Sequence, residues 1–334
     1  MQVEQPREVG ISVVIPAFQA AATIERAIMS AAHQTCRPKE IIVCDDGSQD
    51  GTAAVVEALG SSVNGVPLRF MTQPNRGAGA ARNKAIEEAT SEWIAFLDAD
   101  DEWLPGKLEH SVSEINKSDL TLVAHNYVQV GADKNEQLVD CTRRFLSAEN
   151  PLSALYRYGF IATSTVVVRK QAVRNAGGFD ETLATAQDFD LWLKVLSEDG
   201  ARFVITDAPL MRYTLSATGI TSHTMRRLDC TLRVAQRHQR SYPNLIVRLM
   251  AIHYEAVTVY WRAQNYLRAF WILVLLVARL VGSPLMINQS NRETNGVPNW
   301  LVWFFWLWVI GLFGAYLYRF NHLIVAFYKL VLSL

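Results

Sequence analysis

The sequence predicts an α/β protein with a doubly wound, mainly parallel sheet and flanking helices, followed by membrane-associated helices. Two observations predict the sheet: β-branched runs alternate with helical patterns four times in about 110 residues, and a polar loop follows each run. The third observation is compositional, because the chain becomes strongly apolar beyond about residue 240. We therefore expect one domain over 1–240 and a helical membrane-associated region over 241–334.

Hydrophobic periodicity marks the first two strand-helix repeats. The run ISVVIPAF predicts a strand over 11–18, and helical spacing of apolar residues predicts a helix over 21–34. EIIVC predicts a second strand over 40–44, and Asp50 is placed to cap a helix over 52–59. Both repeats suit the crossover connections of a parallel sheet.

Two further repeats complete the predicted sheet. Residues 68–89 predict a strand, a turn that contains glycine, and a helix. Residues 92–101 begin with EWIAFL, an apolar run typical of a strand buried on both faces. Ligands of such sheets bind beyond the carboxyl ends of the strands, so the loops after the four strands are expected along one rim. These loops are 16–19, 45–48, 75–82 and 98–101.

Each of these loops also has a purely structural explanation. Residues 45–48, DDGS, suit a turn with an Asx cap. For Gly77 and Gly79, close helix packing is favoured over phosphate binding, because the GxGxxG pattern is absent. The acidic residues of 98–101 also suit a solvated loop with a helix cap. The occurrence of all four at one rim favours a binding site.

Residues 98–101, the carboxylate loop, place Asp98, Asp100 and Asp101 directly after a buried strand. Like charges repel one another there unless a hard cation or a hydrogen-bond donor compensates them. The Asp-x-Asp spacing suits Mg²⁺ or Mn²⁺, which keeps its other positions for phosphate oxygens. The sequence therefore predicts a divalent cation bound together with a diphosphate.

Six motifs occur in a fixed order over roughly residues 10–220. They are ISVVIPAFQ, IIVCDDGSQDGT, NRGAGAARN, FLDADD, GGFDE and QDFDLWLK. In this order and spacing they resemble the family 2 glycosyltransferases. The resemblance implies the GT-A fold and transfer of a sugar from a nucleotide-diphosphate donor with inversion at the anomeric carbon.

The resemblance also implies which residues bind the donor. The donor-binding candidates are Pro16, Ala17, Phe18, Asp46, Arg82 and Asp98. The first three would flank the base and ribose, and Asp46 would hydrogen-bond the base. Arg82 would lie near the base or the carboxylate loop, and Asp98 would bind the ribose.

Further roles follow from the same resemblance. Asp100 would hold the cation on the pyrophosphate, Asp188 would be the general base, and Asp45 would support its own loop. The acceptor-side candidates are Gly178, Phe179, Asp180 and Trp192. For the turn at 177–180, a structural role is the alternative.

The chemistry itself requires a base, and a carboxylate distant in sequence from the carboxylate loop fits that need. The charge of the leaving diphosphate must be neutralised while the acceptor hydroxyl loses its proton and attacks from the opposite face. Asp188 and Asp190 are the two candidates. The alternative is that Asp188 merely lies in the first turn of a helix, where a negative charge interacts favourably with the helix dipole.

Two positions depart from the family pattern. The residue before the base is commonly Glu and is Gln187 here, and Thr214 stands where relatives often carry His. His223 lies farther along the chain and is not an aligned substitute. Arg212 remains a candidate for pyrophosphate contact in that segment.

Charge and cysteine usage argue against several other classes of protein. Lys and Arg number 32, as do Asp and Glu, so no overall basic field holds nucleic acid. The four cysteines form no CxxC pair, which predicts reduced core thiols in a cytosolic setting. The N-terminal residues lack the apolar segment of a signal peptide.

The C-terminal region predicts contact with a membrane. Residues 299–318 carry no charge and suit a transmembrane helix, with a buried Trp-rich stripe as the alternative. Residues 269–287 contain Arg279 and are either a second span, as the positive-inside bias favours, or an interfacial helix. Residues 323–334 are predicted along the interface. The basic helix at 225–240 presents either a solvated face or a face for anionic headgroups.

These expectations combine into a glycosyltransferase of cell-surface polysaccharide synthesis at the cytoplasmic membrane, with its catalytic domain facing the cytosol. The expected partners are a nucleotide-diphospho-sugar donor, membrane lipids, and a glycan or lipid-linked acceptor such as a polyprenyl-linked saccharide. One alternative is a sugar-phosphate nucleotidyltransferase, which would need neither Asp188 nor a membrane anchor. The other is a catalytically silent membrane scaffold.

Overall fold

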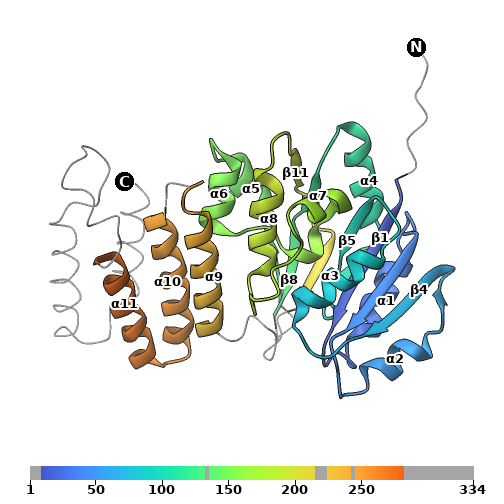
Figure 1. Cartoon of the computed structure of the whole chain (residues 1–334), viewed down its shortest axis with the longest axis horizontal. Helices are drawn as coiled ribbons and strands as arrows, with labels where there is room; N and C mark the ends of the chain where they lie inside the picture. The colour runs from blue at the N-terminus through green and yellow to red at the C-terminus, as the bar shows by residue number, and fades with distance from the viewer. Residues whose placement is uncertain (1–8, 132–134, 215–223, 242–244, 282–334) are drawn as a thin grey trace, which may run out of the picture. The chain divides into compact units, whose positions relative to one another are not determined.

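The computed structural model describes residues 9–131, 135–214, 224–241 and 245–281, which belong to two compact units (Figure 1). The first unit extends from Met1 to Tyr242 and the second from Pro243 to Leu334. All the strands of the described residues lie in the first unit. The candidate site residues lie there as well.

An eight-stranded sheet in the order β11-β7-β10-β5-β1-β2-β4-β3 forms the centre of the first unit. Its strands are β1 (Ile11–Ala17), β2 (Glu40–Asp45), β3 (Ser62–Val63), β4 (Val66–Thr72), β5 (Trp93–Phe96), β7 (Leu122–His125), β10 (Val167–Arg169) and β11 (Phe203–Thr206). β5, β1, β2 and β4 run parallel, and Val14 of β1 lies opposite Ile42 on one side and Phe96 on the other. These are the four strands predicted from the sequence, so the predicted parallel core is confirmed.

The other strands make the sheet mixed. β10 runs antiparallel between β5 and β7, and β11 is parallel to β7. The short β3 runs antiparallel to β4 at the opposite edge. The predicted doubly wound arrangement therefore describes the half that contains β1 and β2, whereas an antiparallel strand extends the other half.

Four helices follow the parallel strands: α1 (Ile24–Ala32), α2 (Thr52–Ala58), α3 (Ala78–Glu88) and α4 (Lys107–Lys117). The N-cap of α2 is Gly51 and not Asp50 as predicted, although Asp50 Oδ1 accepts the Thr52 N–H at 3.1 Å just before the helix. α1 begins at Ile24 instead of residue 21. The preceding residues form a turn in which the Ala20 N–H donates to Thr52 Oγ1 at 2.9 Å and the Ala21 N–H donates to Asp50 Oδ2 at 3.0 Å.

Both faces of the parallel strands are buried. Val13 and Ile15 of β1 belong to one apolar cluster with Ile24 and Ile28 of α1. Val14 points to the opposite face, is fully buried, and lies on the side where α3 packs against β1 and β2. This double coverage explains the continuous apolar runs in the sequence.

A second sheet of four strands follows the order β6-β12-β8-β9. Its strands are β6 (Glu102–Trp103), β8 (Tyr127–Val130), β9 (Glu136–Val139) and β12 (Met211–Thr214). β12 pairs with β6, which directly follows the carboxylate loop. The end of β12 thereby reaches this loop, and the Thr214 N–H donates to Asp101 Oδ1 at 3.3 Å.

The remaining elements of the first unit are mostly helical. They are α5 (Cys141–Leu146), α6 (Pro151–Tyr158), the 3-10 turn η1 (Thr163–Thr165), α7 (Lys170–Asn175), α8 (Gln187–Ser197) and α9 (Thr224–His238). α8 packs against α6, α7 and α9 (Figure 1). The Tyr156 hydroxyl donates to the carbonyl oxygen of Ala235 at 2.8 Å, which ties α6 to α9.

The described part of the second unit is a pair of packed helices, α10 (Leu245–Arg262) and α11 (Tyr266–Val281). Arg279 lies 2.9 Å from His253 Nε2, so this charged residue joins the two helices. No helix among the described residues has the length and apolar character to cross a membrane. The predicted segment 269–287 is described only as far as Val281, and 299–318 and 323–334 lie outside the described residues.

Candidate active site

The carboxylate loop begins directly after β5, at the carboxyl end of the parallel strands. Asp101 is 1% exposed, and its Oδ2 accepts a hydrogen bond from Ser164 Oγ at 2.6 Å. Burial, followed by the charges of Asp98 and Asp100, raises the pKa of Asp101 well above its usual value. Asp101 is therefore an internal support of the loop rather than a group that meets a ligand.

Asp100, like Asp98, is half-buried. Burial and the neighbouring charge of Asp98 raise the pKa of Asp100 above its usual value. The backbone carbonyl of Asp100 accepts a hydrogen bond from Arg26 at 2.7 Å, which holds this part of the loop against α1. Both effects disfavour the ionised form of Asp100, which a positive charge beside the carboxylate would stabilise.

Arg82 of α3 joins the carboxylate loop to α8. One end of its guanidinium lies 2.5 Å from Asp98 Oδ1, and the other lies 3.4 Å from Gln187 Oε1. The group also stacks over the Phe179 ring at 5.2 Å from the ring centroid. Since only 8% of the Arg82 side chain is exposed, the ion pair orients Asp98 from inside the protein.

Asp188 lies in the first turn of α8 and presents a fixed carboxylate. Oδ2 accepts a hydrogen bond from Thr163 Oγ1 at 2.8 Å, and Oδ1 accepts one from the Phe189 N–H at 2.8 Å. The residue before α8, Ala186, has a φ of 59°, a left-handed conformation that costs energy for a residue with a Cβ. Such strain is typical of functional turns.

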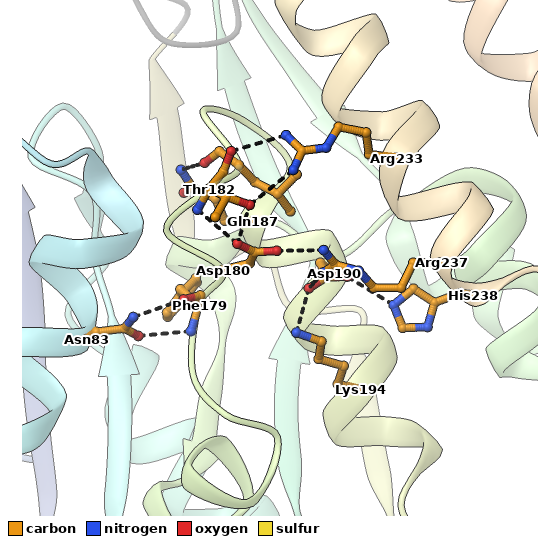
Figure 2. A network of polar contacts seen from close by, with 11 residues as sticks. Asn83, Phe179, Asp180, Thr182, Gln187, Asp190, Lys194, Arg233, Arg237 and His238 are labelled. Atoms are coloured by element: carbon orange, nitrogen blue, oxygen red, sulfur yellow. Dashed lines mark hydrogen bonds and ion pairs between the residues drawn. The ribbon is translucent and has the colours of Figure 1, made fainter.

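Asp190, the second candidate base, has different surroundings (Figure 2). Its side chain is completely buried and meets Lys194 at 2.8 Å, Arg237 at 2.7 Å and His238 at 3.0 Å. Burial raises the pKa of Asp190, but hydrogen bonds from His238 and Lys194 outweigh burial and hold the pKa below its usual value. Asp190 therefore anchors α8 to α9, which leaves Asp188 as the candidate base.

The predicted acceptor-side turn is anchored on both sides (Figure 2). Asn83 of α3 donates to the Phe179 carbonyl at 2.9 Å and accepts the Phe179 N–H at 2.8 Å. Asp180 accepts hydrogen bonds from Thr182 and from Arg237 of α9. Burial opposes ionisation of Asp180, but these bonds lower its pKa to about 2.

Trp192 does not lie on the acceptor side. It is 0% exposed and packs with Phe96 at 5.8 Å and Phe179 at 6.2 Å between ring centroids. The predicted acceptor contact of Trp192 is therefore wrong, because its helical position points into the aromatic core beneath β5. The Phe179 ring is also buried, at 2% exposure, so within this turn Gly178 and Asp180 remain candidates for acceptor contact.

The donor-side candidates differ in exposure. Pro16 and Ala17 are buried in β1, opposite Cys44 and Asp45 of β2, whereas the Phe18 side chain is 51% exposed. Phe18 is therefore the one side chain of these three that reaches solvent at the rim.

Asp46 is almost completely buried, at 2% exposure. Oδ1 accepts hydrogen bonds from Gln73 Nε2 and the Arg76 N–H, both at 2.8 Å, and Oδ2 accepts the Gly77 N–H at 2.7 Å. Asp46 thus fastens the loop that precedes α3. Its contact with a base stays a prediction, and that contact would have to use the remaining lone pairs of this carboxylate.

Arg212, the pyrophosphate candidate, lies on β12. Its guanidinium pairs with Glu136 of β9 at 3.3 Å, and both side chains are nearly half exposed. The pair joins two strands of the second sheet. Contact of Arg212 with a pyrophosphate stays a prediction.

The donor set suits a divalent cation. Mg²⁺ and Mn²⁺ are commonly held by one or two carboxylates together with substrate phosphates. Asp100 supplies one half-buried carboxylate, whose pKa is raised first by burial and then by the charge of Asp98. In the described residues no three His, Cys, Asp or Glu side chains group into a metal site. A cation at Asp100 would therefore share its coordination with the diphosphate.

Two residues that the sequence did not single out join the parts of this site. Thr163 bonds to Asp188, and Ser164 bonds to the carboxylate loop. No spacing rule distinguishes FIATSTVVV from an ordinary strand approach. The position of η1 beside β5 is what brings these hydroxyl groups to both parts of the site.

The comparison with protein families agrees with this geometry. The model described as "Glycosyl transferase family 2" matches residues 12–175, which include β1, the carboxylate loop and η1. The fold and this match define a transferase that uses a nucleotide sugar. Residues 12–175 of this chain form a family 2 glycosyltransferase domain.

This chain matches two curated relatives over most of their length. The amylovoran biosynthesis glycosyltransferase AmsB of Erwinia amylovora is 29% identical over 213 residues, which are 62% of this chain and 70% of AmsB. The Escherichia coli enzyme WfgD, a UDP-Glc:alpha-D-GlcNAc-diphosphoundecaprenol beta-1,3-glucosyltransferase, is 28% identical over 220 residues, which are 65% of this chain and 82% of WfgD.

Solved structures share the fold at low sequence identity. Residues 1–349 of TarS from S. aureus, in complex with UDP-GlcNAc, match with a TM-score of 0.57 and 18% identity, covering 84% of this chain and 86% of that one. The mannosyltransferase PcManGT from Pyrobaculum calidifontis, in complex with GDP-Man and Mn²⁺, matches with a TM-score of 0.56 and 18% identity over 93% of this chain and 90% of that one. The architecture is therefore the GT-A-like α/β fold that the sequence predicted.

Proposed function

We propose that this glycosyltransferase moves a sugar from a nucleoside diphosphate donor to a polyprenyl-linked saccharide at the cytosolic face of the membrane, with inversion at the anomeric carbon. The observation that carries the proposal is the placement of Asp188 beside the carboxylate loop, joined through Thr163 and Ser164. Inversion by a single displacement requires a base on one side of the sugar and stabilisation of the leaving diphosphate on the other.

On the donor side, Asp98 binds the ribose and is held in place by Arg82. Phe18 covers the base from the end of β1, where its side chain is exposed. Asp100 would hold Mg²⁺ or Mn²⁺ at the diphosphate. When bound, this cation neutralises the charge that develops on the departing diphosphate.

On the acceptor side, Asp188 takes the proton of the acceptor hydroxyl. The hydroxyl oxygen forms the new bond to the anomeric carbon as the bond from that carbon to the diphosphate oxygen breaks, and the diphosphate leaves with the electron pair. Each Asp188 oxygen accepts one hydrogen bond in the structure, and an ionised carboxylate has further acceptor sites. Asp188 can therefore accept the proton and keep both of these hydrogen bonds.

Two observations support a lipid-linked acceptor at the cytoplasmic membrane. The relative WfgD is named for an acceptor that is a GlcNAc-diphosphoundecaprenol. The twenty uncharged residues at 299–318 suit a membrane anchor, which would keep enzyme and acceptor on one surface. Cell-surface polysaccharide synthesis is the process that such a transfer serves.

The proposal is tested with the full chain in membranes. UDP-glucose, UDP-GlcNAc and GDP-mannose are offered in turn, with Mn²⁺ or with a chelator, and GlcNAc-diphosphoundecaprenol is the acceptor. We expect release of the nucleoside diphosphate and a glycosylated lipid with one donor, only when the metal is present. The anomeric configuration of the product, read by NMR, should be opposite to that of the donor.

Two other outcomes would contradict the proposal. Release of inorganic diphosphate when a sugar phosphate and a nucleoside triphosphate are supplied, with no glycosylated lipid, would identify a nucleotidyltransferase. Retention of the donor configuration in the product would exclude single displacement and would remove the need for Asp188 as a base.

A further inference from the structure

We propose that Thr163 and Ser164 form a positioning element that fixes the base Asp188 relative to the carboxylate loop. This inference rests on the proposed function, because it assigns the two residues a role in the same reaction. Both residues lie in η1, which joins α6 to β10, and both are buried, at 6% and 1% exposure. Neither was assigned a role by the sequence motifs.

Ser164 holds the carboxylate loop at both ends. Its hydroxyl oxygen accepts the Asp98 N–H at 3.0 Å, and the same hydroxyl donates to Asp101 Oδ2 at 2.6 Å. Its backbone carbonyl accepts a hydrogen bond from the Trp103 indole at 2.7 Å. One residue therefore contacts the first and last members of the loop and the strand that follows it.

Thr163 holds the base. Its hydroxyl donates to Asp188 Oδ2 at 2.8 Å, the ordinary length of an O–H···O hydrogen bond. The Phe189 N–H restrains the other oxygen. The carboxylate therefore has a defined rotation, and its free lone pairs have a defined direction toward an acceptor hydroxyl.

η1, the turn that carries both hydroxyl groups, is closed by backbone hydrogen bonds. The Thr165 N–H donates to the Ala162 carbonyl at 3.1 Å, and the Val166 N–H donates to the Thr163 carbonyl at 3.0 Å. β10, which follows immediately, is paired with β5 on one side and β7 on the other. The separation of the base from the carboxylate loop is thus set by consecutive residues of an anchored turn.

A second connection between the loop and α8 is weaker. It runs from Asp98 through Arg82 to Gln187, and its last contact is 3.4 Å long. That length exceeds the usual range of 2.7 to about 3.2 Å for an N–H···O hydrogen bond. η1 therefore provides the tighter of the two connections.

Thr163→Val tests the base half of the proposal, because it keeps the branched shape and removes the hydroxyl. With UDP-glucose, Mn²⁺ and GlcNAc-diphosphoundecaprenol, we expect kcat to fall by about 10- to 100-fold, as for a lost hydrogen bond to a charged group, while KM for UDP-glucose stays unchanged. Thr163→Ser should restore most of kcat. The acidic limb of the pH profile of kcat should move to higher pH in Thr163→Val, because the hydroxyl favours the ionised carboxylate.

Thr165→Val is the matched control. Thr165 belongs to the same turn and is also buried, but its hydroxyl donates to the Ala162 carbonyl at 2.7 Å and contacts neither Asp188 nor the loop. It should lower the melting temperature without the kcat loss or the pH shift. If Thr165→Val reproduced both kinetic effects, a general loosening of the turn would explain them and the proposal would be overturned.

Ser164→Ala tests the proposed role of Ser164 in holding the carboxylate loop. Since Ser164 contacts the loop and not Asp188, we expect a higher KM for UDP-glucose and a higher Mn²⁺ requirement, with a smaller effect on kcat than in Thr163→Val. Calorimetry of UDP binding with Mn²⁺ gives the same comparison without turnover. Equal changes of all parameters in both variants would contradict the division of roles.

Asp188→Asn separates failure of the inference from failure of the proposed function. If Asp188→Asn lacks activity and Thr163→Val has full activity, Thr163 does not position the base, although the base assignment stands. If Asp188→Asn transfers sugar at the full rate, the base assignment itself is wrong and the role of Thr163 falls with it. When Asp188→Asn is combined with Thr163→Val, no further loss is expected, because Thr163 acts through the carboxylate.

Discussion

Asp188 and Asp190 lie two positions apart on α8, and their partners give them different chemistry. Asp190 is enclosed by three cationic or ionisable side chains and contributes to the attachment of α9. Asp188 accepts its two hydrogen bonds from neutral donors, the Thr163 hydroxyl and the Phe189 N–H. A carboxylate without a cationic partner is the better proton acceptor of the two.

Asp188→Asn should lower kcat by about a hundred- to ten-thousand-fold, the usual contribution of a general base. The amide keeps the size of the carboxylate but cannot take a proton. KM for the donor should stay close to the wild-type value, because no donor contact is removed. Steady-state kinetics checks this expectation, and an unchanged kcat would exclude Asp188 as the base.

Asp100→Asn should weaken metal-dependent binding of UDP far more than binding of uridine. Only the diphosphate is bridged to the protein through a cation, so the nucleoside should be insensitive to the change. Titration calorimetry of both compounds, with and without Mn²⁺, measures the difference. Glu57→Gln, an exposed acidic position on α2, is the control and should change neither affinity. An equal loss for UDP and uridine would contradict the assignment of Asp100 to the cation.

Gly177 and Gly178 allow a comparison of backbone strain with steric conflict. Both have a left-handed φ, of 80° and 71°, but a Cβ on Gly177 meets nothing within 4 Å, whereas a Cβ on Gly178 lies 2.7 Å from Asn83 Oδ1. Gly177→Ala should cost about 1 kcal/mol of unfolding free energy, the usual penalty of a left-handed residue. Gly178→Ala should cost about 1–3 kcal/mol more, because Asn83 must also release the Phe179 backbone. Chemical denaturation of both variants provides the test, and equal losses would show that Asn83 yields freely.

At the scale of secondary structure, the parallel core was predictable and the rest of the sheet was not. β1, β2 and β4 are each followed by a helix, and β5 is followed by α4 after the two-residue β6, so periodicity and connection rules identify them. β10 has only three residues and runs antiparallel, and its pairing with β5 is set by tertiary contacts. The second sheet depends on β12, which is far from β6 in the sequence and reaches it only after the chain has passed through α8.

The same limit explains the outcome at the site. The carboxylate loop, Arg82 and Asp188 belong to motifs with a recognisable order, and they lie together as the rim rule predicts. Trp192 belongs to a motif too, but its neighbours in the motif do not reveal which face of α8 is buried. Thr163 and Ser164 lie outside any motif, so their role depends on the packing of η1 against β5.

Arg237 connects three elements, since it bonds to Asp180 of the acceptor-side turn and to Asp190 of α8 from its position on α9. Arg237→Met should lower the unfolding free energy by about 1–2 kcal/mol, because Arg237 is partly exposed and Asp190 keeps two other partners. Denaturant melts check the loss. Arg240→Met, an exposed position near the end of the same helix, should change stability little.

The contribution of Asp180 should depend on pH in a defined direction. Because its pKa in the folded protein is lowered from 3.8 to about 2, the stabilising effect is complete above the unfolded value and is lost as pH falls through the folded value. The stability difference between wild type and Asp180→Asn should therefore be constant near neutral pH and shrink between pH 3.8 and about 2. A difference that grows on acidification would contradict the lowered pKa.

At the scale of the whole molecule, the catalytic groups and the predicted membrane contacts occupy different units. Every proposed donor contact precedes Tyr242, and the uncharged residues 299–318 belong to the second unit. A unit that contains both sheets and their own apolar cores is expected to fold without the second one. Donor binding and acceptor access are therefore separable properties of this chain.

This separation gives a prediction for a shortened chain that ends at Tyr242. It should be more soluble than the full chain and should bind UDP with Mn²⁺ at similar affinity, because its donor site is intact. Transfer to GlcNAc-diphosphoundecaprenol in vesicles should fall strongly, since the full chain confines enzyme and acceptor to one surface and raises their effective concentration. Transfer to a detergent-soluble, short-chain analogue of that acceptor should fall much less.

The full chain should also stay in the membrane pellet through high salt and alkaline carbonate, because burial of an apolar span is not screened by ions. Release by carbonate would exclude the span, and undiminished transfer in vesicles by the shortened chain would show that the second unit does not bring the enzyme to its acceptor.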